Sequence, residues 1–374
     1  MSVLSYALVS IVGTLLRLVP WPSQTGLLEI GRPDRDSPVL LTCNFRLTVE
    51  RVRRALRGVD AYLLVANSRG INVWCAATGG LLTHHDVLSA LKTSGIEDRV
   101  DHRQVILPQL AATGVEGRVL ERKSGWKVVW GPVYADDIPL FLDTQLKKGA
   151  GMRQVRFPWT ERLEMAAFWA FPSSVLLALI TAVFWRHALV PAICVVWVLA
   201  TALYMSFPLY GRWLGSGSRG GAVLLAVFAV LWVVAMLVLA SYTFVLGYAS
   251  WGEIGRWGVL TFVVLGVMLF DLVGSTPLYK SGLHEDRLLK VVLDEGKCRG
   301  VGYCEDVCPR DCYEVNRAQH SAAMPRAHQC VQCGACIVQC PFDALQFQSP
   351  RGEKITPETI RKFKLNLMGK RVGR

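Results

Sequence analysis

The stretch CVQCGACIVQCP, residues 330–341, carries four cysteines at the spacing C-x2-C-x2-C-x3-C followed by proline. Thiolates at this spacing wrap one corner of an iron–sulfur cube, and the fourth cysteine usually binds the other cluster of a two-cluster fold. A structural zinc site is the alternative, but four cysteines this close together before a proline disfavour it. The stretch therefore predicts one cluster on Cys330, Cys333 and Cys336 and a second cluster on Cys340.

A shift of 32 residues aligns this run with CRGVGYCEDVCP, residues 298–309, and Val301 stands where the second cysteine is expected. With crossed ligation, the sequence predicts one four-thiolate set and one three-thiolate set. The first is Cys308, Cys330, Cys333 and Cys336, and the second is Cys298, Cys304 and Cys340. The full set suits a 4Fe–4S cluster. Three thiolates suit a 3Fe–4S centre, or a 4Fe–4S centre in which something else binds one iron.

The two runs resemble those of bacterial two-cluster ferredoxins, so residues 284–374 are predicted to form an α+β ferredoxin-like iron–sulfur domain. Cys312 follows the first run in CPRDCYE. It resembles the extra cysteine beside the clusters of seven-iron ferredoxins, where it is a spectator. A substitute ligand for the incomplete set is the alternative.

The composition indicates a membrane protein. Hydrophobic residues make up 52% of the 374, and the formal net charge is +12. In such a protein a basic excess more often marks cytoplasmic loops than nucleic-acid binding, and no nucleic-acid partner is expected. Eight of the eleven cysteines lie between Cys298 and Cys340, which indicates metal binding rather than a secreted disulfide framework.

Four apolar runs predict a transmembrane domain over residues 165–278, with lipid as a partner. The runs are 165–185, 189–209, 221–246 and 257–278, and the first three contain no charged residue. Asp271, the one acid within a run, is expected at a helix end reaching the headgroups. Lysines and arginines concentrate before the first run, between the second and third, and after the fourth. Their positions predict a multi-pass protein of the cytoplasmic membrane with both soluble domains on the cytoplasmic side.

Residues 1–22 form an apolar start in which Leu4, Leu8 and Ile11 share a helical face with Leu15 and Leu18. This spacing predicts a helix lying in the membrane interface. A signal peptide is disfavoured because there is no basic n-region and Arg17 interrupts the apolar run.

Residues 38–150 have the alternating pattern of a doubly wound α/β domain. Short apolar runs predict strands; they are VLLTC, AYLLVA, INVWC, VILP and KVVWG. Helical periodicity over LTVERVRRALRG and HHDVLSALKTSG ends at Gly58 and Gly95, and Thr83 with Asp86 predicts a helix start.

Several motifs in this domain resemble the corrinoid-binding domain of the corrinoid iron–sulfur protein large subunit. They are TCNFRLTVERVRRAL, DAYLLVANSRGINVW, VILPQLAATGVEG and SGWKVVWGPVYADDIPLFL. The segment NVWCAATGG, residues 72–80, is similar to the cap-helix motif of mercury-methylating corrinoid proteins. In that family the α/β domain precedes a membrane bundle, and the partner is a small two-cluster ferredoxin, which here is fused at the C-terminus.

The resemblance implies that Cys75 is the catalytic residue and the lower axial ligand of a corrinoid cobalt. Asn72, Trp74, Ala76 and Ala77 would form the cofactor-binding segment around it. A thiolate is a strong donor that tunes the metal it binds, and it would favour transfer of a carbanion-like methyl group. The ferredoxin would return the cobalt to Co(I). The alternative for Cys75 is a packed core cysteine.

The resemblance further implies a membrane-anchored corrinoid methyltransferase whose donor is a separate methyltransferase or a methyl-folate or methyl-pterin. Hg(II) is a candidate acceptor. Two departures leave mercury less well supported as a substrate than corrinoid binding. Thr78-Gly79-Gly80 replaces the family's glycine–lysine ending, and residues 341–374 contain no cysteine. Two alternatives stay open. One is a methyl carrier of one-carbon metabolism, and the other is a membrane ferredoxin-type electron-transfer protein that has lost the corrinoid.

Other possible metal-binding side chains have simpler explanations. His84 and His85 are adjacent, so on a helix they point in different directions and are expected to form a polar helix start. Cys43 and Cys194 lie in apolar runs and are expected to be core or membrane residues.

Overall fold

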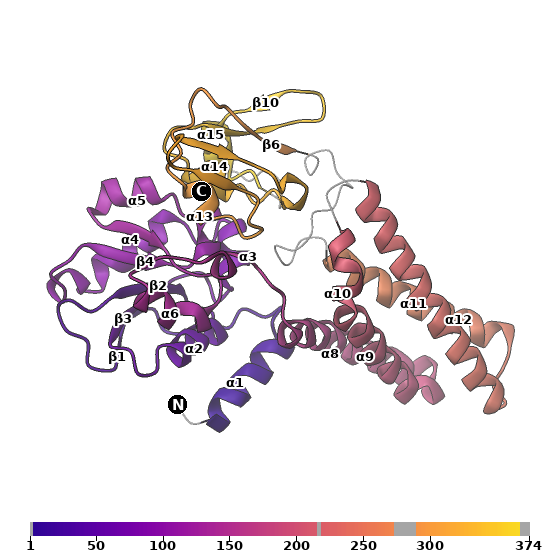
Figure 1. Cartoon of the computed structure of the whole chain (residues 1–374). Coiled ribbons are helices and arrows are strands. Elements are labelled where there is room, and N and C mark those ends of the chain that lie inside the picture. The colour runs from indigo at the N-terminus through magenta and orange to yellow at the C-terminus, as the bar shows by residue number, and fades with distance from the viewer. Residues whose placement is uncertain (1–2, 215–217, 273–288, 367–374) are drawn as a thin grey trace. The chain divides into compact units, whose positions relative to one another are not determined.

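The computed structural model describes residues 3–214, 218–272 and 289–366, which form two compact units (Figure 1). The first unit combines residues 20–155 with the described C-terminal residues 289–366. The second contains residues 3–19 and the described residues from 156 to 272. The predicted α/β and iron–sulfur domains therefore belong to one compact unit, although the predicted transmembrane helices separate them in sequence.

The α/β domain is built on a five-stranded sheet in the order β1-β3-β2-β4-β5. The strands are β1 (Gly26–Ile30), β2 (Val39–Cys43), β3 (Ala61–Ala66), β4 (Gln104–Leu107) and β5 (Lys127–Trp130). Strands β2 to β5 are parallel, as predicted, whereas β1 pairs antiparallel with β3. The edge strand β1 belongs to this sheet although it precedes residue 38, the predicted start of the domain.

Helices cover both faces of this sheet (Figure 1). On one face, α2 (Arg46–Ala55), α6 (Ile138–Asp143) and α7 (Ala150–Arg153) pack through Val52, Phe141 and Met152 onto Leu40, Leu63 and Ile106. Helices α4 (His84–Thr93) and α5 (Gly117–Ser124) lie on the opposite face. Short 3-10 turns complete the domain: η1 (Ile96–Asp98), η2 (Gln109–Thr113) and η3 (Ala135–Asp137).

The predicted start of α4 and the predicted ends of α2 and α4 are confirmed. Thr83 and Asp86 form a reciprocal capping box at the start of α4, with a distance of 2.8 Å from Thr83 N to Asp86 Oδ2. Gly58 and Gly95 follow α2 and α4 with φ of +81° and +69°, a backbone conformation that favours glycine.

The chain leaves β2 for β3 on one side and returns to β4 on the other. The carboxyl ends of β2 and β4 therefore meet at a topological switch point, the place where open α/β sheets bind ligands.

The C-terminal domain is α+β, as predicted. An antiparallel sheet of order β10-β9-β6 contains β6 (Lys290–Leu293), β9 (Leu345–Gln348) and β10 (Lys354–Ile355), beside the hairpin β7 (Glu314–Asn316) and β8 (Ser321–Ala323). The helices are α13 (Tyr303–Asp306), η7 (Ala327–Gln329), α14 (Ala335–Gln339) and α15 (Pro357–Phe363). The predicted domain bounds, 284 and 374, both lie outside the described residues.

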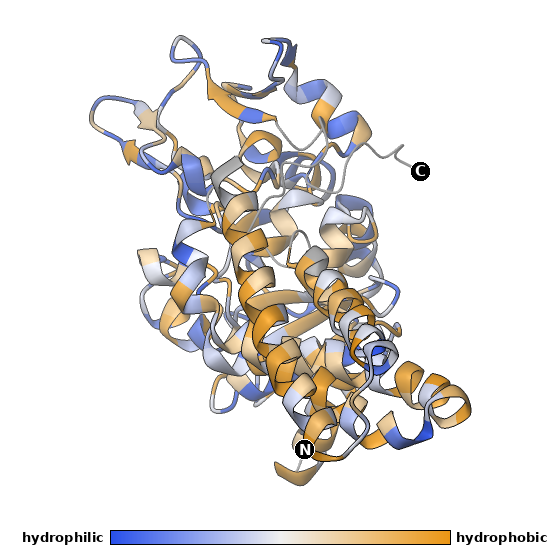
Figure 2. Ribbon diagram, turned by 90° about the vertical axis from the view of Figure 1, so that its right-hand side faces the viewer, coloured by the Kyte–Doolittle hydropathy of each residue, from blue (hydrophilic) through white to orange (hydrophobic). Residues whose placement is uncertain are grey.

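The second unit contains four helices long and apolar enough to cross a membrane, by length and composition. They are α8 (Trp159–Phe184), α9 (Leu189–Met205, preceded by the 3-10 turn η4, Arg186–Ala188), α11 (Ser218–Val245) and α12 (Trp251–Asp271). Figure 2 shows hydrophobic residues along most of their length. The first and last begin six residues before the predicted runs, and α12 ends at Asp271. The predicted extension to residue 278 lies outside the described residues.

Shorter helices complete the second unit. Helix α1 (Val3–Leu15) packs against α8, and Arg17, just after it, contacts the Met165 sulfur at 3.8 Å. Helix α10 (Phe207–Tyr210) and the turn η5 (Gly211–Trp213) follow α9. At the junctions of the long helices, the buried Glu253 carboxylate accepts from Trp185 Nε1 at 2.9 Å and lies 2.9 Å from His187 Nε2. That contact ties the start of α12 to the end of α8.

Candidate functional site

The turn after β3 is organised by Asn44, which follows β2. Its buried side-chain oxygen accepts hydrogen bonds from Ser68 N, Ser68 Oγ and Gly70 N, each at 2.9 Å. Gly70 has φ of +73°, and a Cβ there would lie 2.6 Å from Pro22 N, so only glycine fits. Two neighbouring parallel strands thus fix the backbone that leads into the Cys75 segment.

Residues Val73–Thr78 form the short helix α3, so the predicted strand INVWC was wrong. The Asn72 side chain caps this helix by accepting from Cys75 N at 3.0 Å. An N-cap asparagine stabilises a helix start by about 1 kcal/mol. The cap outweighs the β-branched, aromatic composition that favours a strand, and it agrees with the cap helix implied by the family resemblance.

Only one side chain of α3 reaches the surface. Val73, Trp74, Ala76, Ala77 and Thr78 are buried, whereas Cys75 is partly exposed. The structure therefore gives Trp74, Ala76 and Ala77 a place inside the domain, where they hold the helix. Cys75 and its cap Asn72, both partly exposed, are the predicted site residues that face outward.

Helix α3 is seated tightly on the turn η2. A Cβ on Gly114 would lie 2.6 Å from Ala77 O and 2.5 Å from Leu82 O, so glycine is required for this approach. Thr78 Oγ1 donates to Trp74 O at 2.7 Å within the helix. The Cys75 thiol is thus presented by a rigid helix at the carboxyl edge of the sheet, where a thiolate could ligate a soft metal.

His84 is buried and His85 is exposed, but their rings lie side by side with centroids 4.2 Å apart, so the expectation that they point in different directions was wrong. His84 Nδ1 lies 3.7 Å from Glu116 Oε1, which accepts from Lys364 Nζ at 2.7 Å. Burial lowers the pKa of His84 to about 4, although the negative charge of Glu116 acts to raise it. Burial acts to raise the pKa of Glu116, but the Lys364 hydrogen bond and charge lower it overall. At neutral pH this is a neutral imidazole beside a Glu–Lys ion pair.

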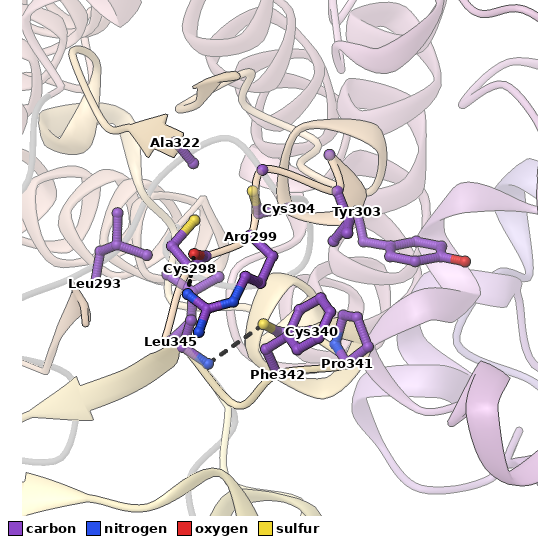
Figure 3. A pocket seen from close by; sticks show the side chains of 14 residues that line it. Leu293, Cys298, Arg299, Tyr303, Cys304, Ala322, Cys340, Pro341, Phe342 and Leu345 are labelled. Carbon is purple, nitrogen blue, oxygen red and sulfur yellow. Dashed lines mark hydrogen bonds between the residues drawn. The ribbon is translucent and has the colours of Figure 1, made fainter. Parts of the chain in front are cut away.

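In the iron–sulfur domain, the cysteines line two pockets. Cys298, Cys304 and Cys340 line the first pocket together with Val301. Figure 3 shows the three sulfur atoms around this pocket with Arg299 beside them. Arg299 donates to Gly296 O at 2.9 Å and Cys298 O at 3.0 Å, which holds the loop before the missing ligand.

The second pocket is lined by Cys308, Cys330, Cys333 and Cys336. The two pockets therefore group the predicted ligands as the crossed pattern predicts: three in the first pocket and four, together with Cys312, in the second. Among the residues that the structure describes, no three His, Cys, Asp or Glu side chains are close enough to hold a single metal ion. The cysteines instead surround cavities, the arrangement that a multi-iron cluster needs.

Cys312 lines the second pocket, beside Cys308 and Cys330, and does not line the first. Its thiol hydrogen-bonds to the Cys308 sulfur and so lowers the pKa of Cys308, while the bonds to Cys308 and Cys330 raise the pKa of Cys312. Cys312 is thus not placed to complete the three-cysteine set, and the predicted spectator role fits its position.

Burial favours the neutral form of several cysteine thiols that line the pockets. Burial raises the pKa of Cys304 to about 12, and it raises the pKa of Cys333 and Cys336 as well. Because the thiolate is the metal ligand, cluster insertion must release these protons. Tyr313 OH donates to Cys336 Sγ at 3.1 Å and would stabilise the resulting charge.

Sequence reasoning missed three polar residues that join the two domains of the first unit: Lys148, Gln339 and Asn366. Lys148 lies between domains with its side chain 2% exposed, Gln339 is buried, and Asn366 Nδ2 donates to Thr78 O at 3.0 Å. A glutamine between two cluster ligands in an otherwise apolar turn was the available sequence signal for Gln339. Lys148 and Asn366 sit in polar stretches that give no such signal.

Comparison with known proteins finds a match within each domain of this unit. Residues 17–142 match the family described as CO dehydrogenase/acetyl-CoA synthase delta subunit. Residues 327–346 match the 4Fe-4S binding domain. The second match covers the complete cysteine run but not the first run, in which Val301 stands.

Among curated proteins, the chain is similar to acetyl-CoA decarbonylase/synthase complex subunit gamma from several archaea. The Methanopyrus kandleri protein is 38% identical over 128 residues, 34% of this chain and 27% of that protein. The Methanothermobacter thermautotrophicus protein is 40% identical over 126 residues, 33% of this chain and 27% of that protein. The chain thus spans about a quarter of the length of these relatives. The matches support the expected kinship of the α/β domain with corrinoid iron–sulfur proteins, joined here to a 4Fe-4S binding domain.

Proposed function

We propose that this protein is a membrane-anchored corrinoid protein that carries out methyl transfer, with its fused iron–sulfur domain supplying the electrons that keep cobalt reduced. One observation carries the proposal: α3 exposes Cys75 alone, at the switch-point edge of a domain related to acetyl-CoA decarbonylase/synthase subunits. The two cysteine-lined pockets belong to the same compact unit.

A bound corrinoid would supply a cobalt that accepts a methyl group when reduced and passes it to an acceptor. Cys75 would ligate that cobalt through its sulfur. Asn72 caps the helix and so fixes the direction of the Cys75 side chain. The buried Trp74, Ala76 and Ala77 anchor α3, which packs on η2, and so hold the Cys75 thiol in place.

The iron–sulfur part of the proposal rests on the two pockets. The second pocket would hold a 4Fe–4S cluster on Cys308, Cys330, Cys333 and Cys336. The first would hold a centre with three cysteine thiolates, a 3Fe–4S cluster or a 4Fe–4S cluster with a foreign ligand. Clusters of this kind move single electrons, which is what cobalt reduction needs.

The membrane part rests on the four long apolar helices and on the basic residues that flank them. Lipid is the proposed partner of these helices, with α1 at the interface and both soluble domains on the cytoplasmic side of the cytoplasmic membrane. Reagents that label cysteines placed in either soluble domain should fail to reach them in intact cells. Labelling of one domain alone would contradict the four-span topology.

The methyl donor is proposed to be a separate methyltransferase protein, because the related gamma proteins are subunits of a complex. Mercury as the acceptor has one support, the similarity of residues 72–80 to the mercury-methylating motif. Carriage of methyl groups in one-carbon metabolism is supported by the similarity to acetyl-CoA decarbonylase/synthase subunits. Assays with and without Hg(II) separate the two acceptors.

The test is anaerobic purification of the full chain with cobalt and iron analysis and a methyl-transfer assay. Cys75→Ala should change the corrinoid absorption spectrum and lower methyl transfer by about 100-fold or more, because the metal loses a strong ligand. Cys194→Ala is the matched control, since Cys194 is an exposed cysteine on α9.

A corrinoid spectrum identical in wild type and Cys75→Ala would reject the ligand role and leave Cys75 as a packing residue. Stoichiometric iron without any cobalt, after growth with a corrinoid source, would favour the membrane electron-transfer alternative.

A further inference from the structure

The iron–sulfur domain contacts the α/β domain through two segments that are equivalent in the 32-residue repeat. We call residues 304–311 docking loop 1 and residues 336–343 docking loop 2. Loop 1 contains Cys304 of the first pocket and Cys308 of the second, and loop 2 contains Cys336 of the second pocket and Cys340 of the first. Each loop therefore contributes one cysteine to each pocket.

Docking loop 1 binds the side chain of Lys148, which follows α6 in the α/β domain. Lys148 Nζ donates to Asp306 O at 2.7 Å and lies 3.0 Å from Asp306 Oδ1. It also donates to Gln109 Oε1 at 3.1 Å and to Gly131 O at 3.2 Å, so one ammonium group joins both domains. A charge so deeply buried is tolerated only because these partners satisfy it.

The rest of loop 1 holds the segment that follows Lys148. Arg153 lies 3.3 Å from Asp311 Oδ1, and Gln154 Nε2 donates to Asp311 Oδ2 at 3.0 Å. Val155 N donates to Pro309 O at 2.9 Å. Backbone and side-chain contacts together therefore fix the last residues of the α/β domain.

Docking loop 2 acts through a neutral amide. Gln339, 3% exposed, donates from Nε2 to Ala112 O and Val115 O, each at 2.7 Å, and its Oε1 accepts from Gly117 N at 3.2 Å. The side chain thus satisfies three backbone groups of the α/β domain where η2 leads into α5. In the opposite direction, Arg118 of the α/β domain donates to Pro341 O of docking loop 2 at 2.8 Å.

Neither loop can hold this shape by itself. The helical parts, α13 and α14, have four and five residues, and helices of that length are not stable alone. With clusters bound, metal–sulfur bonds pin each loop at two points. Without them, the four cysteines of the loops are ordinary side chains and the loops lose their fixed spacing.

We propose that the α/β surface formed by residues 109–118 and 148–155 is a docking site for the cluster-loaded form of the iron–sulfur domain, so that filled pockets are required for docking. The inference rests on the iron–sulfur part of the proposed function and needs no corrinoid. Docking would have a consequence for Cys75. Because α3 packs on η2, loss of the clusters would loosen the helix that carries the thiol. A chain without its electron donor would then lack a rigid Cys75 helix.

The experiment is hydrogen–deuterium exchange on the full chain in detergent, before and after anaerobic removal of the clusters with an oxidant and an iron chelator. Iron and sulfide analysis verifies both states. Peptides covering residues 109–118 and 148–155 should exchange at least about 10-fold faster in the cluster-free protein, as locally opened segments do. Peptides from β3, in the centre of the α/β domain, should be unchanged.

A variant separates docking from cluster loss. Gln339→Leu should speed exchange in residues 109–118 while iron content stays at the wild-type value. Gln348→Leu is the matched control, because Gln348 donates to Gly352 O within its own hairpin. Lys148→Met should act in the same way on residues 148–155, with the neighbouring exposed Lys147→Met as its control.

Unchanged exchange in both surfaces after complete cluster removal would overturn the inference, since docking would then be independent of the clusters. A preparation without iron or sulfide would instead contradict the proposed function itself. Faster exchange over the whole α/β domain, including β3, would also overturn the inference, because it would report unfolding rather than undocking.

Discussion

The two cysteine pockets are built on nearly the same backbone and differ in chemistry. Gly302 and Gly334, 32 residues apart, begin α13 and α14 with φ of +85° and +77°. Asp311 and Asp343 repeat a left-handed turn with φ of +50° and +52°. Equivalent backbone N–H groups, those of residues 312 and 344, donate to the sulfurs of Cys308 and Cys340 at 3.3 and 3.4 Å.

Three pairs of equivalent residues separate the pockets. Val301 in the first pocket corresponds to Cys333 in the second, Ala344 to Cys312, and Leu345 to Tyr313. In each pair the second pocket has the group that binds iron or donates a hydrogen bond to a ligand sulfur. The comparison teaches that the repeat gives the two pockets similar backbones, whereas these three positions give the second pocket one more candidate ligand and two more hydrogen-bond donors.

Removal of Cys340 should have the largest effect on this comparison. In Cys340→Ala the first pocket retains only Cys298 and Cys304, too few to hold a centre, while the second keeps all four thiolates. About half of the iron and sulfide should be lost. Elemental analysis with EPR of the reduced protein checks this; loss of the four-thiolate signal instead would refute crossed ligation.

The companion variant Cys308→Ala should convert the second pocket to three thiolates, although Cys308 lies in the first run. Its spectrum should then resemble that of two three-thiolate centres.

Val301→Cys should make the first pocket like the second. Wild-type protein oxidised without air should show the EPR signal of a 3Fe–4S centre, because one corner of the first pocket has no cysteine. The variant should lose that signal and bind more iron per chain, since a fourth thiolate retains the fourth iron. Val301→Ala, which adds no donor atom, is the control and should behave as wild type. Two identical all-cysteine centres in the wild type would contradict the assignment.

Tyr313→Phe should have a smaller effect, confined to the second pocket. Loss of the hydroxyl that donates to Cys336 Sγ removes stabilisation of the more negative, reduced cluster, so the reduction potential of that cluster should fall. Potentiometric titration followed by EPR measures the change. The first centre, which has Leu345 at the equivalent place, should keep its potential; a shift of both would point to a general structural change.

Cys312→Ala should have the smallest effect of the series. The cluster should form with unchanged iron content, because Cys312 is placed beside the ligands rather than among them. Its potential should fall slightly, through loss of the thiol donor to Cys308 and Cys330. A drop in iron content on this substitution would make Cys312 a ligand.

The parts of the site that were predictable from sequence are those encoded by local spacing. Cysteine intervals and the 32-residue repeat give the sulfur grouping in both pockets, because each ligand loop is a few residues long. Thr83 and Asp86 likewise predict the start of α4, because a capping box joins residues only three positions apart. The strand predicted for INVWC was wrong because the prediction rested on composition, whereas a single side-chain contact, the Asn72 cap, starts a helix there.

The sequence by itself determined the order of domains, the four apolar helices, the two sets of cluster cysteines and the special segment around Cys75. Tertiary structure alone decided that five residues of α3 are buried and Cys75 is not, because burial depends on η2 and on Gly114, about 40 residues away by chain position. It alone joined Gln339 to Ala112 and Lys148 to Asp306, since polar contacts across more than 150 residues leave no periodicity in the chain.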